Sequence, residues 1–200
     1  ATGGGGGIGM QPVTERKKLV KAVGRARALA ERTFSNDGVY LEKLLERPRH
    51  IEFQVVADKH GNACTVFERD CSVQRPYQKV MEESPAPAVD EKSLSALAET
   101  ICKAVQTMGY DNIGTVEMLR GEDGSFTFLE MNTRLQVEHG VTEEVTDVDL
   151  VVAQIRSAAG DKLSDIFETE PESKGHAVPA RVYAEDPIKF FPSPGHLETF

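Results

Sequence analysis

The sequence predicts an α+β fold, and three observations support that class. Apolar residues recur at helical spacing in some segments and alternate with polar residues in others. Turn signals, such as residues 59–62 and the Asp123-Gly124 pair, join neighbouring strand patterns. Strand and helix patterns also follow one another without strict βαβ order. We therefore expect an α+β architecture in a chain whose 200 residues suffice for one large domain or parts of two.

The first 44 residues predict a loop, a helix and a short strand. Glycines fill positions 3–7, and backbone N–H groups of such a loop can approach phosphate oxygens, although a plain flexible linker is the commoner explanation. Apolar residues at helical spacing from Leu19 to Ala30 predict a helix that residues 35–38 end. Residues 39–42 are expected to form a short strand.

The middle of the chain predicts two strands and a polar stretch. Ile51, Phe53 and Val55 alternate with polar residues, which is typical of a half-buried strand. The turn at 59–62 leads into a second strand over 64–68. A polar stretch follows over 69–79.

Helix and strand patterns also share the second half of the chain. A helix is expected over 93–108 with its end at Gly109, followed by strands over 113–119 and 126–131. Asp147 is the expected N-cap of a helix that ends near Gly160. Last come a polar linker over 165–175 and a strand over 177–184.

Composition excludes several classes of function. The 23 Lys and Arg against 32 Asp and Glu give a formal net charge of −9, which disfavours a nucleic-acid binder. No apolar run is long enough to cross a bilayer. Three cysteines without metal-type spacing predict reduced thiols in a cytosolic or matrix-like compartment. Because the chain begins with Ala1 rather than Met, we expect it to be a piece of a longer protein.

The Asp123-Gly124 pair sets two carboxylates face to face. Asp-Gly is preferred in two-residue type I′ hairpins. Counting outward from that turn places Glu117 opposite Glu130, with Cβ atoms about 5 Å apart. Like charges opposed in this way destabilise a sheet unless a cation lies between them, and hard oxygen ligands suit Mg²⁺. An exposed hairpin with two unrelated acids is the alternative that this pattern leaves open.

Polar residues continue to alternate after the hairpin. They are Glu130, Asn132, Arg134, Gln136 and Glu138, and an extended chain would place them on one side. The set favours an anion site beside a metal, with Glu138 placed to move a proton. An amphipathic edge strand would explain the alternation but not the choice of side chains.

These motifs together resemble biotin carboxylase, an ATP-grasp enzyme, over essentially the whole chain. The string at 130–139 is the most specific part. The other matching motifs are residues 3–10, 34–37, 42–43, 47–52 and 68–75. The resemblance implies a partial ATP-grasp fold: residues 1–44 form part of the lid, residues 45–164 form the core with the metal and bicarbonate site, and residues 165–200 form a linker and the start of the C-terminal subdomain.

The resemblance also implies a role for each matching residue. The lid and adenine contacts are Gly5, Gly6, Gly7, Met10, Glu42 and Lys43, and the further nucleotide contacts are His50, Gln74 and Leu119. The metal ligands are Glu117, Glu130 and Asn132, and the bicarbonate and carboxyphosphate contacts are Lys79, Arg134, Gln136 and Val137. Glu138 is the implied base, and Arg181 stabilises the biotin enolate. Two positions depart from the pattern: Tyr77 stands where histidine is common, and Gly140 where proline usually follows the histidine.

The implied activity is ATP- and bicarbonate-dependent carboxylation of biotin on a carrier protein, by way of carboxyphosphate. It would use ATP, Mg²⁺ or Mn²⁺, and biotin as the carboxyl acceptor. The implied partners are a biotin carboxyl carrier and a carboxyltransferase, within a homo-oligomer of the full-length form, with no nucleic acid and no membrane. The compartment would be the cytoplasm, or the mitochondrial matrix in a eukaryote. The alternatives are another bicarbonate-activating ATP-grasp ligase, such as carbamoyl-phosphate synthetase, and a catalytically silent fragment.

Overall fold

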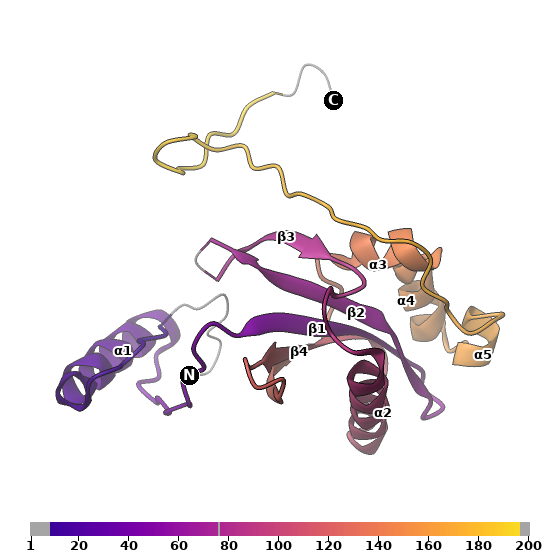
Figure 1. The fold of residues 1–200 in the computed structure, drawn as a ribbon, viewed down its shortest axis with the longest axis horizontal. Helices are drawn as coiled ribbons and strands as arrows, with labels where there is room; N and C mark the ends of the chain where they lie inside the picture. Colours follow the sequence, from indigo (N-terminus) through magenta and orange to yellow (C-terminus); the bar gives the residue numbers. More distant parts are fainter. Residues whose placement is uncertain (1–8, 76, 197–200) are drawn as a thin grey trace.

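The computed structural model describes residues 9–75 and 77–196 as an antiparallel sheet flanked by helices (Figure 1). The strands are β1 (Arg49–Ala57), β2 (Ala63–Gln74), β3 (Lys79–Glu83), β4 (Asn112–Arg120) and β5 (Phe126–Asn132), in the order β3-β2-β1-β4-β5. The helices are η1 (Arg16–Lys18), α1 (Leu19–Phe34), α2 (Glu91–Thr107), α3 (His139–Thr146), α4 (Leu150–Ala159) and α5 (Leu163–Ile166). Helix α1 stands away from the sheet (Figure 1).

One face of the sheet is apolar and is covered by α2. Phe53 and Val55 of β1 are buried on this face against Ile101 and Val105 of the helix. The Asp90 side chain accepts a hydrogen bond from Ser93 N at 2.8 Å, which caps the start of α2. The helix predicted in this region is therefore confirmed, with its start two residues earlier than expected.

The opposite face is apolar at one end and polar at the other. At the apolar end, Val56 of β1 and Ile113 of β4 pack against Leu150 and Ala153 of α4. At the polar end, the side chains of this face belong to Glu52, Gln54, Thr115 and Glu117, all of them buried. Strand β1 is therefore buried on both faces, and the expectation of a half-buried strand was wrong because helices cover both sides of this central strand.

Three strand predictions differ from the structure. Residues 39–42 pair with no strand in the described chain, and Tyr40 and Leu41 remain exposed. Strand β2 continues to Gln74, into the stretch expected to be merely polar, and β3 begins at Lys79, the last residue of that stretch. The strand expected over 177–184 is replaced by two isolated bridges, one from Ala180 to Met81 of β3 and one from Ala177 to Ser84 just after β3. Pro179 lies between these two bridges and has no N–H to donate, so a continuous ladder cannot form.

Helix α3 was not predicted, and it changes the role of Asp147. This residue ends α3 in the left-handed conformation, with φ of 56°. Asp149 is the N-cap of α4, because its carboxylate accepts a hydrogen bond from Val152 N at 2.8 Å. The expected end of α4 at Gly160 is confirmed.

The β4–β5 hairpin pairs Glu117 with Glu130, as predicted, but by a different route. Gly121 N donates to Ser125 O at 2.9 Å, which leaves a three-residue loop with Gly124 at φ of 81°. Asp123 has no positive φ, so the expected type I′ turn was wrong. The pairing shifts by one residue between Glu117 and Met118, and this bulge in β5 offsets the extra loop residue.

Candidate active site

A row of charged side chains crosses the polar end of the sheet. Strand pairing sets Arg69 beside Glu52, Glu52 beside Glu117, and Glu117 beside Glu130. The first three are buried, whereas Glu130 is exposed. Carboxylates that face one another across strands repel, so this row requires positive charge close by.

Lys79, the first residue of β3, supplies one of these positive charges. Its Nζ contacts the carboxylate of Glu52 and lies 3.0 Å from Glu117 Oε1 and 2.5 Å from Glu138 Oε1. Burial alone would lower the pKa of Lys79, but the surrounding carboxylates raise it above its usual range. Lys79 is therefore a cation that joins three carboxylates from three different parts of the chain.

Arg69 supplies the second charge and ties the sheet to α3. Its Nε donates to Glu52 Oε1 at 2.7 Å, and its Nη1 donates to Gln54 Oε1 at 2.9 Å and to Thr142 Oγ1 at 2.8 Å. The Arg69 side chain is completely buried. Such a guanidinium fixes Glu52 in place, because its donors have rigid geometry.

Glu138 lies immediately before α3 and is held between two cations. Its Oε1 faces Lys79, and its Oε2 accepts a hydrogen bond from Arg181 Nη2 at 2.7 Å. Burial disfavours the charged form, but the charge and hydrogen bond of Lys79 lower the pKa of Glu138. Arg181 also donates from Nε to Glu82 Oε1 at 2.7 Å, which brings the C-terminal segment onto the site.

Glu117 is the most heavily contacted carboxylate of the row. Its Oε1 accepts hydrogen bonds from Gln136 Nε2 at 2.8 Å and from Asn132 Nδ2 at 2.9 Å. Its Oε2 lies 3.0 Å from His50 Nε2. Burial opposes ionisation, but the contact with His50 and the charge of Lys79 lower the pKa of Glu117 to about 2. Glu117 is therefore ionised at neutral pH.

The predicted extended chain from Glu130 to Glu138 ends with β5 at Asn132. After that the backbone bends, and His139 N donates to Gln136 O at 3.2 Å as the chain turns into α3. The turn still delivers Gln136 and Glu138, both buried, to the site. The prediction of one extended face was therefore wrong, although most of its polar side chains do meet.

Some predicted residues lie at the edge of this cluster. Gln74 Nε2 lies 3.3 Å from His50 Nδ1, and Leu119 pairs with His50 across β1 and β4. Arg134 is exposed, with its Nη2 3.4 Å from Asn132 Oδ1, and the Val137 side chain is 73% exposed.

Other predicted residues are not brought to the cluster. Met10, Glu42 and Lys43 are exposed, and within the described ranges they share no hydrogen bond or ion pair with it. Gly5, Gly6 and Gly7 lie outside the described residues.

Sequence reasoning missed four contributors to the site, namely Glu52, Gln54, Arg69 and Glu82. Glu52 and Gln54 alternate with apolar residues on β1, so they were expected on a solvent-facing side. The sequence does contain a pattern that could have identified them, because acidic, amide and basic side chains recur at every second residue of neighbouring strands and so share one sheet face. The covering helix α3 could not be anticipated from that pattern.

The side chains fit a divalent cation. Carboxylates outnumber the permanent cations Arg69, Lys79 and Arg181 in this cluster. Glu130 and Asn132 offer oxygens at its open side, and Mg²⁺ prefers such ligands. Gln136 Oε1 is buried and has no hydrogen-bond partner among the described residues, so the site also has an unused oxygen inside.

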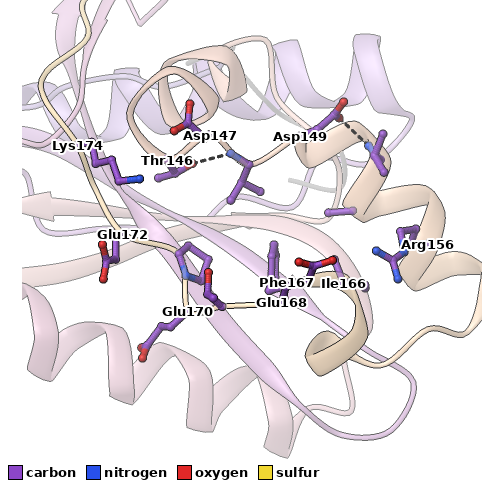
Figure 2. Close-up of a pocket in the computed structure, with 15 residues that line it drawn as sticks. Thr146, Asp147, Asp149, Arg156, Ile166, Phe167, Glu168, Glu170, Glu172 and Lys174 are labelled. Atoms are coloured by element: carbon purple, nitrogen blue, oxygen red, sulfur yellow. Dashed lines mark hydrogen bonds between the residues drawn. The ribbon is translucent and has the colours of Figure 1, made fainter.

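A pocket of about 600 Å³ lies elsewhere, beside α4 and the segment after α5 (Figure 2). Acidic side chains such as Asp147, Glu168 and Glu170 stand around it. No member of the charged row lines this pocket. The charged cluster on the sheet is therefore the candidate active site.

Comparison with known proteins agrees with this geometry. The family model described as "Carbamoyl-phosphate synthase L chain, ATP binding domain" matches residues 1–166. The chain belongs to this family. Within it, Biotin carboxylase 2 of Bacillus subtilis is 49% identical over 200 residues, covering 100% of this chain and 45% of that protein. Biotin carboxylase of Allochromatium vinosum is 50% identical over 200 residues, covering 100% of this chain and 44% of that protein.

Solved structures of biotin carboxylases are also similar to this chain. The Campylobacter jejuni biotin carboxylase complex with β,γ-ATP has a TM-score of 0.88 at 44% identity, over 94% of this chain and 42% of that chain. The biotin carboxylase domain of Hydrogenobacter thermophilus 2-oxoglutarate carboxylase, with MgADP, ADP and bicarbonate, has a TM-score of 0.88 at 40% identity, over 94% and 42%. The predicted α+β, partial ATP-grasp fold is thus confirmed. The chain spans less than half the length of these relatives. In the described part of the chain, no helix is long and apolar enough to cross a membrane.

Proposed function

We propose that the protein carrying this chain is a biotin carboxylase, which carboxylates biotin on a carrier protein with ATP and bicarbonate. The observation that carries the proposal is the buried Glu138 carboxylate, held between Lys79 and Arg181 beside Glu117. This arrangement joins a proton acceptor to cations that can bind anionic substrates. The relatives named biotin carboxylase, and the neighbour whose title names MgADP and bicarbonate, support the same activity.

We assign the metal ligands to Glu117, Glu130 and Asn132, with Mg²⁺ or Mn²⁺ as the ion. When bound, such an ion neutralises charge that develops on the transferred phosphoryl group. In this structure Asn132 Nδ2 is 2.9 Å from Glu117 Oε1 and 3.4 Å from Glu130 Oε1, so its amide orients both carboxylates. Asn132 would turn its amide oxygen towards a cation held there.

We assign bicarbonate binding to Lys79, Arg134, Gln136 and the Val137 backbone. Glu138 takes the proton of the bicarbonate hydroxyl, and the resulting oxyanion attacks the γ-phosphorus of ATP. The bond between that phosphorus and the ADP oxygen breaks, which gives carboxyphosphate. Because Lys79 lowers the pKa of Glu138, the carboxylate is ready to accept a proton but is a weak base. As Lys79 turns towards incoming anions, Glu138 becomes more basic.

Arg181 serves the second half of the reaction. Carboxyphosphate breaks down to CO₂ and phosphate, and the phosphate takes the N1 proton of biotin. The Arg181 guanidinium stabilises the enolate oxygen, and N1 forms the new bond to CO₂. Water must be kept out because carboxyphosphate hydrolyses. We assign that role to a lid within residues 1–44 that includes Gly5, Gly6, Gly7 and Met10.

We assign the remaining nucleotide contacts to Glu42, Lys43, His50, Gln74 and Leu119. Residues 45–164 form the proposed core, and residues 165–200 the proposed linker and start of a further subdomain. The proposed partners are a biotin carboxyl carrier and a carboxyltransferase, within a homo-oligomer. The relatives named above are bacterial, so we propose the cytoplasm as the compartment.

One observation favours a second candidate function. The matching family carries the description of carbamoyl-phosphate synthase, which leaves another bicarbonate-activating ligase as the alternative. Phosphate release from ATP that depends on bicarbonate and rises with free biotin supports the first candidate. Release that rises with ammonia and not with biotin supports the second.

The test compares Glu138→Gln with the matched variant Glu144→Gln on the exposed side of α3. Glutamine keeps the shape of the side chain but cannot accept the proton. We expect Glu138→Gln to lower the biotin-stimulated rate by about 10²–10⁴-fold, the range for loss of a general base, and Glu144→Gln to leave it unchanged. An unchanged rate in Glu138→Gln would show that Glu138 is not the base.

A further inference from the structure

His50, Glu52 and Glu117 bring a ring nitrogen and two carboxylate oxygens to one point of the sheet. One ligand atom of each residue lies within 4.8 Å of the others. His50 Nε2 is 3.0 Å from Glu117 Oε2 and 3.8 Å from Glu52 Oε2. Neighbouring ligand atoms of a tetrahedral zinc ion are about 3.3 Å apart, given bonds of about 2.0–2.1 Å. The two measured distances lie on either side of that value.

The ring nitrogen of His50 is an independent sign of a ligand. His50 is only 9% exposed, and its Nε2 is buried without a hydrogen-bond partner in the described part of the chain. Buried polar atoms are rarely left in this state. The Nε2 of His50 lies 3.0 Å from Glu117 Oε2, a contact that forms an ion pair only if the ring is protonated. A cation between the ring and the carboxylates would give this nitrogen a partner.

We propose that His50, Glu52 and Glu117 form a second cation site, which takes Zn²⁺ in preference to Mg²⁺. An imidazole nitrogen suits zinc, whereas Mg²⁺ selects oxygen ligands. The site shares Glu117 with the proposed magnesium ligands but does not include Glu130 or Asn132. The fourth zinc ligand is a water molecule.

Zinc binding requires two local movements. Lys79 Nζ contacts both Glu52 and Glu117, so it must leave these carboxylates, and Glu138 remains as its partner. His50 Nδ1 must carry the ring proton, so the Gln74 amide, whose Nε2 is now 3.3 Å away, must present its oxygen instead. Zinc would thus withdraw Lys79 and Glu117 from the roles proposed above. This inhibitory consequence rests on the proposed function, but the binding itself does not.

The test is calorimetric titration of the metal-free protein with Zn²⁺, without nucleotide and with Mg²⁺ in excess. We expect one zinc ion per chain, bound at least 100-fold more weakly in both His50→Ala and Glu52→Gln. His60→Ala should keep the affinity of the unchanged protein, because it removes an exposed histidine whose Nε2 lies 3.0 Å from Gly160 O, away from the proposed site. Glu130→Gln weakens the competing magnesium site and should therefore not weaken zinc binding.

Three results would overturn the proposal. Zinc affinity could persist in folded His50→Ala, in which case other histidines or the thiols hold the ion. Excess Mg²⁺ could displace zinc, which would show that the site does not prefer Zn²⁺ over Mg²⁺. Glu130→Gln could weaken zinc binding as much as Glu52→Gln does, which would show that the zinc and magnesium sites are one site. Circular dichroism of each variant establishes folding, and because no nucleotide is present, failure here is distinguishable from failure of the proposed activity.

Discussion

Replacing Arg69 with methionine tests the view that buried charges hold the site together. Arg69 is fully buried and donates to Glu52, Gln54 and Thr142 at 2.7–2.9 Å. Methionine would fill much of the same space but remove one of the two permanent cations, Arg69 and Lys79, that contact Glu52 in the described part of the chain. Removing one member of a buried ion pair costs about 3–5 kcal/mol of unfolding free energy. Because Lys79 remains, we expect the low end, about 3 kcal/mol.

Urea denaturation followed by circular dichroism measures this loss. The control Arg25→Met changes an exposed residue of α1 and should alter stability by less than about 0.5 kcal/mol. The double variant Arg69→Met with Glu52→Gln should recover part of the loss, since the uncompensated charge is then gone. A loss below about 1 kcal/mol in Arg69→Met, or no recovery in the double variant, would refute the reasoning.

Two further predictions concern pH and backbone freedom. The pKa of Glu117 is lowered from 4.5 to about 2 in the folded protein, so its contribution to stability is complete above its unfolded pKa and is lost as pH falls towards 2. Between pH 6 and pH 3 the loss of this contribution lowers the unfolding free energy by about 2 kcal/mol. Urea titrations of Glu117→Gln should lack that part of the pH dependence. An identical pH dependence in the variant and the unchanged protein would contradict the prediction. Gly140 in the first turn of α3 has no positive φ and open space where a Cβ would stand. Gly140→Ala should therefore raise the unfolding free energy by about 0.5–1 kcal/mol in the same assay, and a loss of stability would show that the glycine is needed there.

The pairing of Glu117 with Glu130 could be predicted from the sequence, but the loop and the bulge that produce this pairing could not. The Asp-Gly pair correctly predicted a turn between β4 and β5, but the predicted turn type was wrong. A bulge then restored the expected alignment. Nothing in the residues around Leu129 distinguishes a bulged strand from a regular one, because a bulge depends on how the partner strand and the loop fit together.

The buried polar layer was beyond sequence reasoning for a different reason. Alternation on β1 predicts two faces, but not which of them a helix covers. Arg69, which binds Glu52 and Gln54, is covered by Thr142 of α3. Helix α3 is short and rich in polar residues, so no helix was predicted over its residues. Lys79 was assigned only by resemblance, since β3 is too short and too charged to stand out as a strand.

The bulge in β5 lies between the hairpin tip and the paired carboxylates. Distortions introduced at the tip, around residues 122–125, are therefore separated from Glu117 and Glu130 by the bulge, which already accommodates one extra residue in β5. A peptide tag or a fluorophore inserted at this tip should leave the two acids aligned. The hairpin tip thus offers an attachment point for reporting on the molecule without altering its chemistry.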